Sequence, residues 1–129
     1  MAQVKIYGQK DALKKIQATL SDLIHQSVVD VLSFPQEKRF HRFIGLDTDD
    51  FIYPKDRSEN YIIIEIMMME GRAVETKKRL IKMLFSTITQ NLSINVEDIE
   101  ITIIESPAYN WGFRGMTGDE IQLNYSVDV

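Results

Sequence analysis

The chain contains no cysteine, only three prolines and six glycines, and no excess of basic residues. Without cysteine, it can have no disulfide, no thiolate metal site and no cysteine nucleophile. The formal net charge of -4 at pH 7 argues against a nucleic-acid partner, because nucleic-acid binders normally carry a basic face. We therefore expect no nucleic-acid partner, and no motif in the sequence indicates a metal or another cofactor.

Long apolar runs are also absent. The longest, residues 61–69, is interrupted by Glu65 and is far too short to span a bilayer. The first residues lack the charged start, apolar stretch and cleavage site of a signal peptide. We expect a soluble cytoplasmic protein without a membrane partner.

The 129 residues, 44% of them apolar and 26% charged, suit one globular domain covering residues 1–129. Alternating apolar and polar residues around Val4 and Ile6 predict a first strand, and a helical stripe begins near Asp11. A second strand is expected at residues 40–46. The stripe consists of Leu13, Ile16, Leu20, Ile24, Val28 and Leu32.

The second half shows the same order. A strand at residues 61–69 precedes a helical stripe from Lys77 to Leu92, and residues 99–105 predict another strand. In the tail, an alternating pattern predicts one further short strand. Its apolar residues are Leu123, Tyr125 and Val127.

An offset of 60 residues superimposes the halves, 1–60 and 61–129, as an internal repeat. It places Leu20 on Leu80 and Ile24 on Leu84. The predicted fold class is α+β, with two β-α-β repeats that form a four-stranded sheet with two helices on one face. Two folds share this order of elements: the ferredoxin-like fold, and a fold in which each half is a parallel β-α-β unit.

The strand at residues 61–69 favours the second fold. It is apolar on both faces, which is typical of a strand that is buried on both faces. Two helices can cover only one side of a four-stranded sheet, so we expect another subunit on the second side. A ferredoxin-like sheet can also dimerise through this face, and the pattern supports the second fold without excluding the first.

Few residues suggest catalysis directly. His25 lies in the first predicted helix and His41 in the second strand, and we expect a structural or surface role for both. The acidic loop at residues 47–58 lacks the central glycine and final glutamate of an EF-hand, so a solvated loop is expected there.

Gly71 and Arg72 stand where a strand ends and a helix begins. The first N–H groups of a helix are unpaired and its dipole is positive there. A guanidinium beside them offers a planar, two-pronged donor to a carboxylate. The alternative is a surface arginine in a turn.

Residues 106–120 contain Trp111 and Phe113, which need cover from the core, a partner chain or a ligand. At the offset of 60, these two fall on Phe51 and Tyr53. Both halves thus end in a loop with two aromatics two residues apart. These rings could cap the ends of the sheet, or they could form the wall of a pocket. The two interpretations are compatible if the pocket lies between subunits.

Residues 68–80 and 93–120 resemble the tautomerase superfamily, in particular its long members of the malonate semialdehyde decarboxylase and cis-3-chloroacrylic acid dehalogenase type. The resemblance covers nearly the whole chain and implies a homotrimer whose pocket holds a small carboxylated carbonyl compound. Carried over by position, Arg72 would bind the carboxylate, and Trp111 and Phe113 would form the apolar wall. Arg57 and Arg114 are further candidates for substrate binding.

One departure concerns the catalytic amino-terminal proline of that superfamily, because Ala2 follows Met1 here. If Met1 is removed, the Ala2 amine takes the proline's place. A free α-amine has a pKa of about 7.7–8.0, which burial and Arg72 would lower further. This amine could move a proton alpha to a carbonyl or form an imine, as in an isomerase, decarboxylase or hydratase. The alternative is a small-acid-binding or structural trimer with weak or no catalysis.

Overall fold

The structure is a computed structural model, and it describes residues 2–121. Two β-α-β units follow one another along the chain. The first comprises β1 (Ala2–Gln9), α1 (Lys10–Leu32) and β2 (His41–Leu46), and the second comprises β3 (Ile62–Met69), α2 (Val74–Leu92) and β4 (Ile99–Ser106). The connections and the tail carry the short elements η1 (Thr48–Asp50), η2 (Val96–Asp98), η3 (Ala108–Asn110), β5 (Gly112–Phe113) and β6 (Met116–Thr117).

The main sheet has the strand order β2-β1-β3-β4. Within each unit the two strands are neighbours and parallel, and the units join through the antiparallel pair β1–β3. A ferredoxin-like sheet does not place the two strands of one unit side by side, so the pairing decides between the two predicted folds. The predicted α+β class with two β-α-β units is confirmed.

The strand registers follow the offset of 60 residues. Ile6 lies opposite Phe43 in the first unit, and Ile66 lies opposite Ile103 in the second. A position and its counterpart 60 residues later therefore occupy the same place in their units. Because β1 and β3 are antiparallel, equivalent places lie at opposite ends of the sheet.

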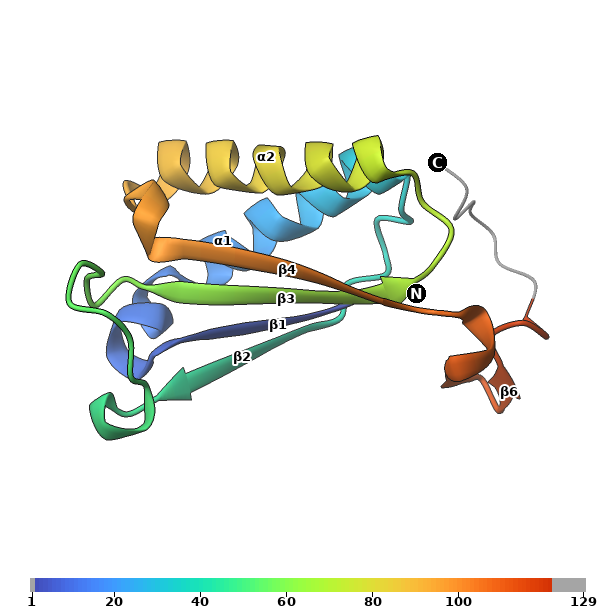
Figure 1. Cartoon of the computed structure of the whole chain (residues 1–129), viewed down its shortest axis with the longest axis horizontal. Coiled ribbons are helices and arrows are strands. Elements are labelled where there is room, and N and C mark those ends of the chain that lie inside the picture. The colour runs from blue at the N-terminus through green and yellow to red at the C-terminus, as the bar shows by residue number, and fades with distance from the viewer. Residues whose placement is uncertain (1, 122–129) are drawn as a thin grey trace.

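Both helices cover one face of the sheet (Figure 1). Their apolar stripes point to that face, as the sequence predicted, and form the core with alternate residues of the central strands. The fully enclosed core side chains include Ile6, Leu20, Ile24, Ile64, Ile66, Leu80, Leu84 and Ile88.

The ends of the helices have local causes. The Gln9 side chain caps α1 by accepting a hydrogen bond from the Ala12 amide at 2.9 Å, which starts the helix one residue before the expected Asp11. Ser33 and Ser93 end the two helices in the left-handed conformation, with φ of 52° and 54°. They are the equivalent serines of the two units.

The second face of the sheet carries both polar and apolar side chains. Tyr7 donates a hydrogen bond to Glu65 at 2.8 Å, while Ile63 and Met67 are half-buried and Ile104 is 43% exposed. Among residues 2–121, neither helix lies on this face (Figure 1).

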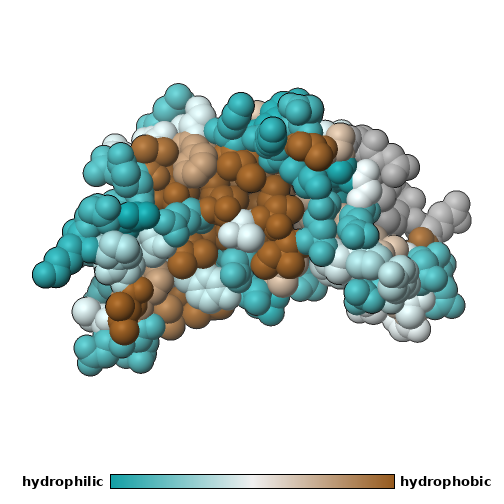
Figure 2. Space-filling model, viewed as in Figure 1, coloured by the Kyte–Doolittle hydropathy of each residue, from teal (hydrophilic) through white to brown (hydrophobic). Residues whose placement is uncertain are grey.

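The free edge of β4 is apolar. Figure 2 shows hydrophobic side chains gathered between α2 and β4. Phe85, Ile101 and Ile103 are only partly buried against the core, and Val96 is 51% exposed. An open, apolar sheet edge is a surface on which another chain can pack.

Two further predictions concern the tail and membranes. The strand predicted around Leu123, Tyr125 and Val127 lies outside the described residues. Within the described part of the chain, neither helix has the length and hydropathy needed to cross a bilayer.

Candidate functional site

The candidate site lies where β1 begins and β3 ends (Figure 1). Ala2 pairs with Met68 of β3, and Met68 pairs with Glu105 of β4. These three residues form a row on the helix-covered face of the sheet, because paired residues share a face. The Ala2 side chain is buried, with 4% of its surface exposed.

Arg72 lies at the same end of the sheet. After β3, the amide of Glu70 donates to the Ser106 carbonyl at 2.9 Å, and Gly71 then turns the chain with a φ of 136°. That conformation favours glycine, which explains the Gly-Arg pair at this junction. Arg72 immediately precedes Ala73, the N-cap of α2, and its surface is only 5% exposed. The alternative of a surface arginine is wrong.

Glu105 and Lys77 form a pair that the sequence reasoning missed. The Lys77 Nζ lies 2.7 Å from the Glu105 Oε1, with both side chains about one quarter exposed or less. The other carboxylate oxygen, Oε2, is buried and accepts no hydrogen bond from the described residues. Only the pairing of β4 with β3 places this carboxylate in the row of Ala2.

Gly118 approaches both Trp111 and the side chain of Met69, the last residue of β3. The Gly118 amide donates to the Trp111 carbonyl at 2.7 Å. A Cβ at Gly118 would overlap the Ala108 carbonyl oxygen and the end of the Met69 side chain. The half-buried Trp111 has a buried indole Nε1 that makes no hydrogen bond with the described residues.

Phe113 and Arg114 lie further out on the β5–β6 hairpin, which projects beyond the end of β4 (Figure 1). Phe113 is half-buried and Arg114 is exposed. The Arg114 guanidinium lies 5.8 Å from the centre of the Phe113 ring. The backbone of Arg114 has a φ of 56° and lies in the turn of the hairpin. Phe113 and Arg114 thus belong to the same segment as Trp111, but they lie outside the four-stranded sheet.

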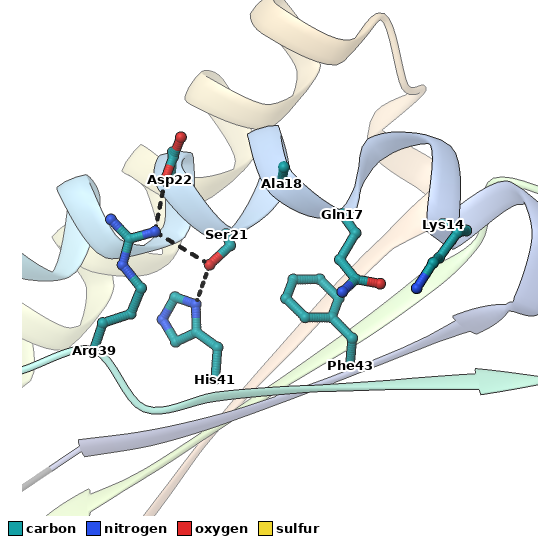
Figure 3. A pocket seen from close by; sticks show the side chains of 8 residues that line it. All are labelled: Lys14, Gln17, Ala18, Ser21, Asp22, Arg39, His41 and Phe43. Atoms are coloured by element: carbon teal, nitrogen blue, oxygen red, sulfur yellow. Dashed lines mark hydrogen bonds and ion pairs between the residues drawn. The ribbon is translucent and has the colours of Figure 1, made fainter.

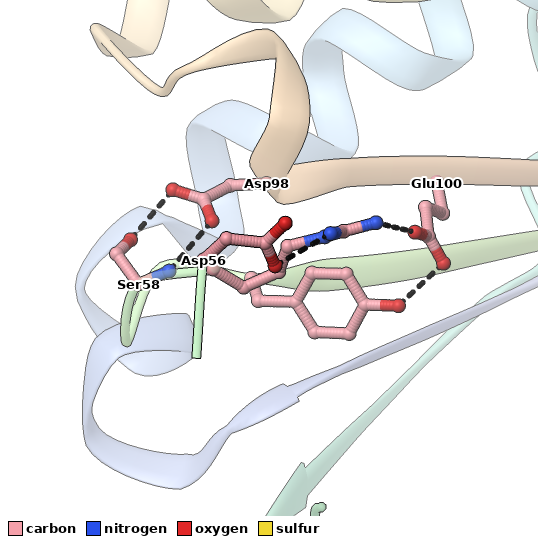
Figure 4. Close-up of polar contacts among 6 residues, drawn as sticks. Asp56, Ser58, Asp98 and Glu100 are labelled. Carbon is pink, nitrogen blue, oxygen red and sulfur yellow. Dashed lines mark hydrogen bonds and ion pairs between the residues drawn. The ribbon is translucent and has the colours of Figure 1, made fainter. Parts of the chain in front are cut away.

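Arg57 lies at the opposite end of the sheet, in the connection to β3. Its guanidinium contacts Glu100 at 2.8 Å and Asp56 at 2.7 Å (Figure 4). Tyr61 donates to the other oxygen of Glu100 at 2.5 Å. The structure therefore does not bring Arg57 together with Ala2 and Arg72 within one chain.

The electrostatics of this distal cluster follow from these contacts. Burial, followed by the hydrogen bond to Glu100, raises the pKa of Tyr61 to about 12. The hydrogen bonds from Tyr61 and Arg57 lower the pKa of Glu100. Nearby, Asp98 is buried and accepts from the Ser58 amide at 2.8 Å and the Ser58 hydroxyl at 2.6 Å (Figure 4). These contacts fix the loop before β3.

The two histidines lie close together between α1 and β2. Their rings are 6.0 Å apart in an edge-to-face arrangement. His25 is buried and its Nε2 lies 2.6 Å from the Gln36 carbonyl oxygen, whereas His41 is half-buried beside a cleft (Figure 3). Across residues 2–121, no three histidine or acidic side chains are arranged to hold a metal ion.

Comparison with known proteins gives one family and several related structures. Residues 38–114 match the family model described as "Tautomerase enzyme". The probable tautomerase YusQ of Bacillus subtilis (strain 168) is 26% identical over 99 residues, which cover 73% of this chain and 78% of YusQ.

Two solved structures illustrate the similarity in fold. FG41 malonate semialdehyde decarboxylase, inhibited by 3-bromopropiolate, superimposes with a TM-score of 0.76 at 25% identity, covering 86% of this chain and 88% of that one. The R7 fused 4-OT asymmetric trimer superimposes with a TM-score of 0.80 at 19% identity, covering 92% and 97%.

Proposed function

Because the chain belongs to the tautomerase family, we propose that it moves a proton alpha to the carbonyl of a small carboxylated keto or enol compound. The observation that supports this proposal is the burial of Ala2 and Arg72 at one end of the sheet, from which the segment with Trp111 continues. Isomerisation, decarboxylation and hydration all fit such a site, since each one stabilises or protonates an enol or enolate.

Each residue has a separate role in this proposal. After removal of Met1, the Ala2 amine acts as the base or acid, and burial favours its neutral form. The Arg72 guanidinium binds the substrate carboxylate in a two-pronged contact. Trp111 covers the reacting carbons, and Phe113 extends this apolar wall. Arg57 and Arg114 remain candidates that would have to act on a site shared between chains.

The assembly in this proposal is a homotrimer. The trimeric fused 4-OT structure supports it, as do the apolar edge of β4 and the uncovered face of the sheet. In a closed ring, the β4 edge of one chain would meet a different surface of the next chain. Such contacts would cover Phe113 and place the hairpin over a neighbouring chain.

A second function, binding of a small acid without efficient catalysis, follows from the replacement of the proline by Ala2. Alanine lacks the ring that fixes the direction of the nitrogen. A small misplacement of a catalytic group can cost a large factor in rate. The two functions share the pocket and differ only in turnover.

Ketonisation of the enol of phenylpyruvate, followed by ultraviolet absorbance, tests the proposal. The parent protein should accelerate it, and Arg72→Lys should lower kcat/KM about tenfold or more, because lysine keeps the charge but loses the two-pronged donor. Arg79→Lys, on the exposed side of α2, is the matched control and should match the parent.

Fluorescence of Trp111, the only tryptophan, separates the two functions. A change of emission on adding phenylpyruvate, without ketonisation, would establish the binding protein instead of the enzyme. If neither ketonisation nor a fluorescence change occurs, the proposed site is wrong.

A further inference from the structure

A cleft lies between α1 and β2 on the helix-covered side of the sheet, where His41 pairs with Val4 of β1. Its cavity volume is about 570 Å³, within the range of small-molecule sites. Lys14, Gln17 and Ser21 line it from α1, and His41 and Phe43 line it from β2 (Figure 3). The helical residues are spaced to share one face, and they span about 10 Å along the helix axis.

One end of the cleft carries a neutral polar pair. The Ser21 Oγ lies 2.8 Å from the His41 Nδ1 (Figure 3). Burial, then the neighbouring His25 and Arg39, lower the pKa of His41 to about 4, so the ring is uncharged at neutral pH. Arg39 donates to the Ser21 Oγ at 3.4 Å and is held by Asp22 at 2.6 Å, which balances its charge (Figure 3).

The other end carries a cation, and an apolar wall lies between the ends. The Lys14 ammonium group makes no ion pair with the described residues, and the Gln17 amide makes no hydrogen bond with them. Between Lys14 and Ser21, the half-buried Phe43 ring rises from β2 toward the helix (Figure 3). Along the cleft, a cation is therefore followed by an apolar wall and then by a neutral hydrogen-bonding pair.

The second unit shows that the fold does not need these polar groups. At the offset of 60, Ser21 corresponds to Ile81, His41 to Ile101 and Lys14 to Val74. The equivalent positions in the second unit therefore carry apolar side chains, which have no hydrogen-bonding groups. The polar pair carries a desolvation cost that an isoleucine pair avoids, which points to a role other than packing.

We propose that this cleft is a second ligand site, for a small elongated carboxylic acid with a polar group at its far end. The carboxylate contacts Lys14, the apolar body packs on Phe43, and the far hydroxyl or carbonyl hydrogen-bonds to the Ser21–His41 pair. The residues that line this cleft include none of those proposed to act in the reaction at Ala2.

Nuclear magnetic resonance of the histidine rings tests the proposal with 4-hydroxybenzoate as the probe. The chain has only two histidines, so each ring signal can be assigned by substitution. Titration should shift the His41 signal to saturation. Benzoate, which lacks the distal hydroxyl, should bind about fivefold more weakly, as expected for one lost neutral hydrogen bond.

Variants locate the two ends of the ligand. Lys14→Gln should weaken 4-hydroxybenzoate about tenfold, through loss of the charge-assisted contact, while the neighbouring Lys15→Gln should have no effect. Ser21→Ala should abolish the difference between the two probes. Measuring these changes through His41 keeps them distinct from any binding near Trp111.

Three results would overturn the site: a His41 signal that does not move at millimolar probe, equal losses in Lys14→Gln and Lys15→Gln, or inorganic phosphate binding as well as 4-hydroxybenzoate does. The last result would mean that the cleft attracts anions by charge alone.

Discussion

At the scale of single residues, the environment of His41 has a measurable consequence for stability. Its folded-state pKa of about 4 lies below the value of about 6.5 expected for an unfolded chain. As the pH falls below 6.5, the unfolded state takes up the proton first, and the free energy of unfolding decreases until the pH reaches the folded value. Because the ring is partly exposed, solvent screening limits this loss to about 1–2 kcal/mol.

Urea unfolding at pH 7 and at a pH near 4 checks this prediction. Carboxylates also titrate over this range, so the useful quantity is the difference between the parent and His41→Gln. The variant should lose less stability on acidification, by about 1–2 kcal/mol. An identical loss in both proteins would mean that His41 is not held neutral.

The residue scale is also where the sequence was least informative. The strand-Gly-Arg-helix junction drew attention to Arg72, and the structure buries this residue after a glycine at positive φ. Its role as a carboxylate ligand stays a prediction. The Glu105–Lys77 pair and the Ser21–His41 pair join residues from different elements, and neither has a local pattern. Their proximity depends on strand register and helix packing, which a single sequence does not specify.

At the scale of elements, the tail after β4 is positioned by one glycine. A side chain at Gly118 would overlap the Ala108 carbonyl and Met69, whereas a Cβ at Gly112 would have nothing closer than 4.0 Å. We predict that Gly118→Ala displaces Trp111 from its present position beside residue 118, shifts the Trp111 emission to longer wavelength and costs about 1–3 kcal/mol, as overpacking typically does.

Gly112→Ala is the control and should keep both the emission of Trp111 and the stability of the parent. Fluorescence spectra and urea unfolding of the three proteins supply the comparison. If Gly118→Ala behaves like Gly112→Ala, the tail is not fixed in this way.

Most elements were predictable because each has its own periodicity. The two helical stripes and the strand at residues 61–69 correspond to α1, α2 and β3, with ends within a few residues of those expected. The sequence does not reveal that Arg57 lies at the opposite end of the sheet from Arg72. Since the two units run antiparallel, the loop before β3 lies at the far end from Arg72, and Arg57 is occupied there by Asp56 and Glu100.

At the scale of the whole molecule, the uncovered sheet face predicts an assembly. Multi-angle light scattering should give three times the 15.0 kDa of one chain, because a trimer would cover the apolar residues of this face and of the β4 edge. Ile104→Asp should dissociate the trimer while leaving the far-ultraviolet circular dichroism unchanged, since its side chain is not in the core of one chain.

Two further substitutions serve as controls for Ile104→Asp. Ile52→Asp, at a position 91% exposed, should remain trimeric, and Ile64→Asp should abolish folding, because it places an unpaired carboxylate in the core. A parent protein that is monomeric at micromolar concentration would refute the assembly.

In the proposed reaction, the Ala2 amine is the group that moves the proton. Proton nuclear magnetic resonance can follow deuterium uptake at carbon 3 of 2-oxobutanoate in D₂O, with the intact mass of each protein showing where its chain begins. The comparison is between the parent protein and a variant with one glycine inserted between Met1 and Ala2, which displaces the terminal amine by about 3.5 Å. We predict that the parent begins at Ala2 and catalyses the exchange, and that the insertion slows it about a hundredfold. Equal exchange rates in the two proteins, or a parent that retains Met1 and still catalyses, would contradict the role of the Ala2 amine.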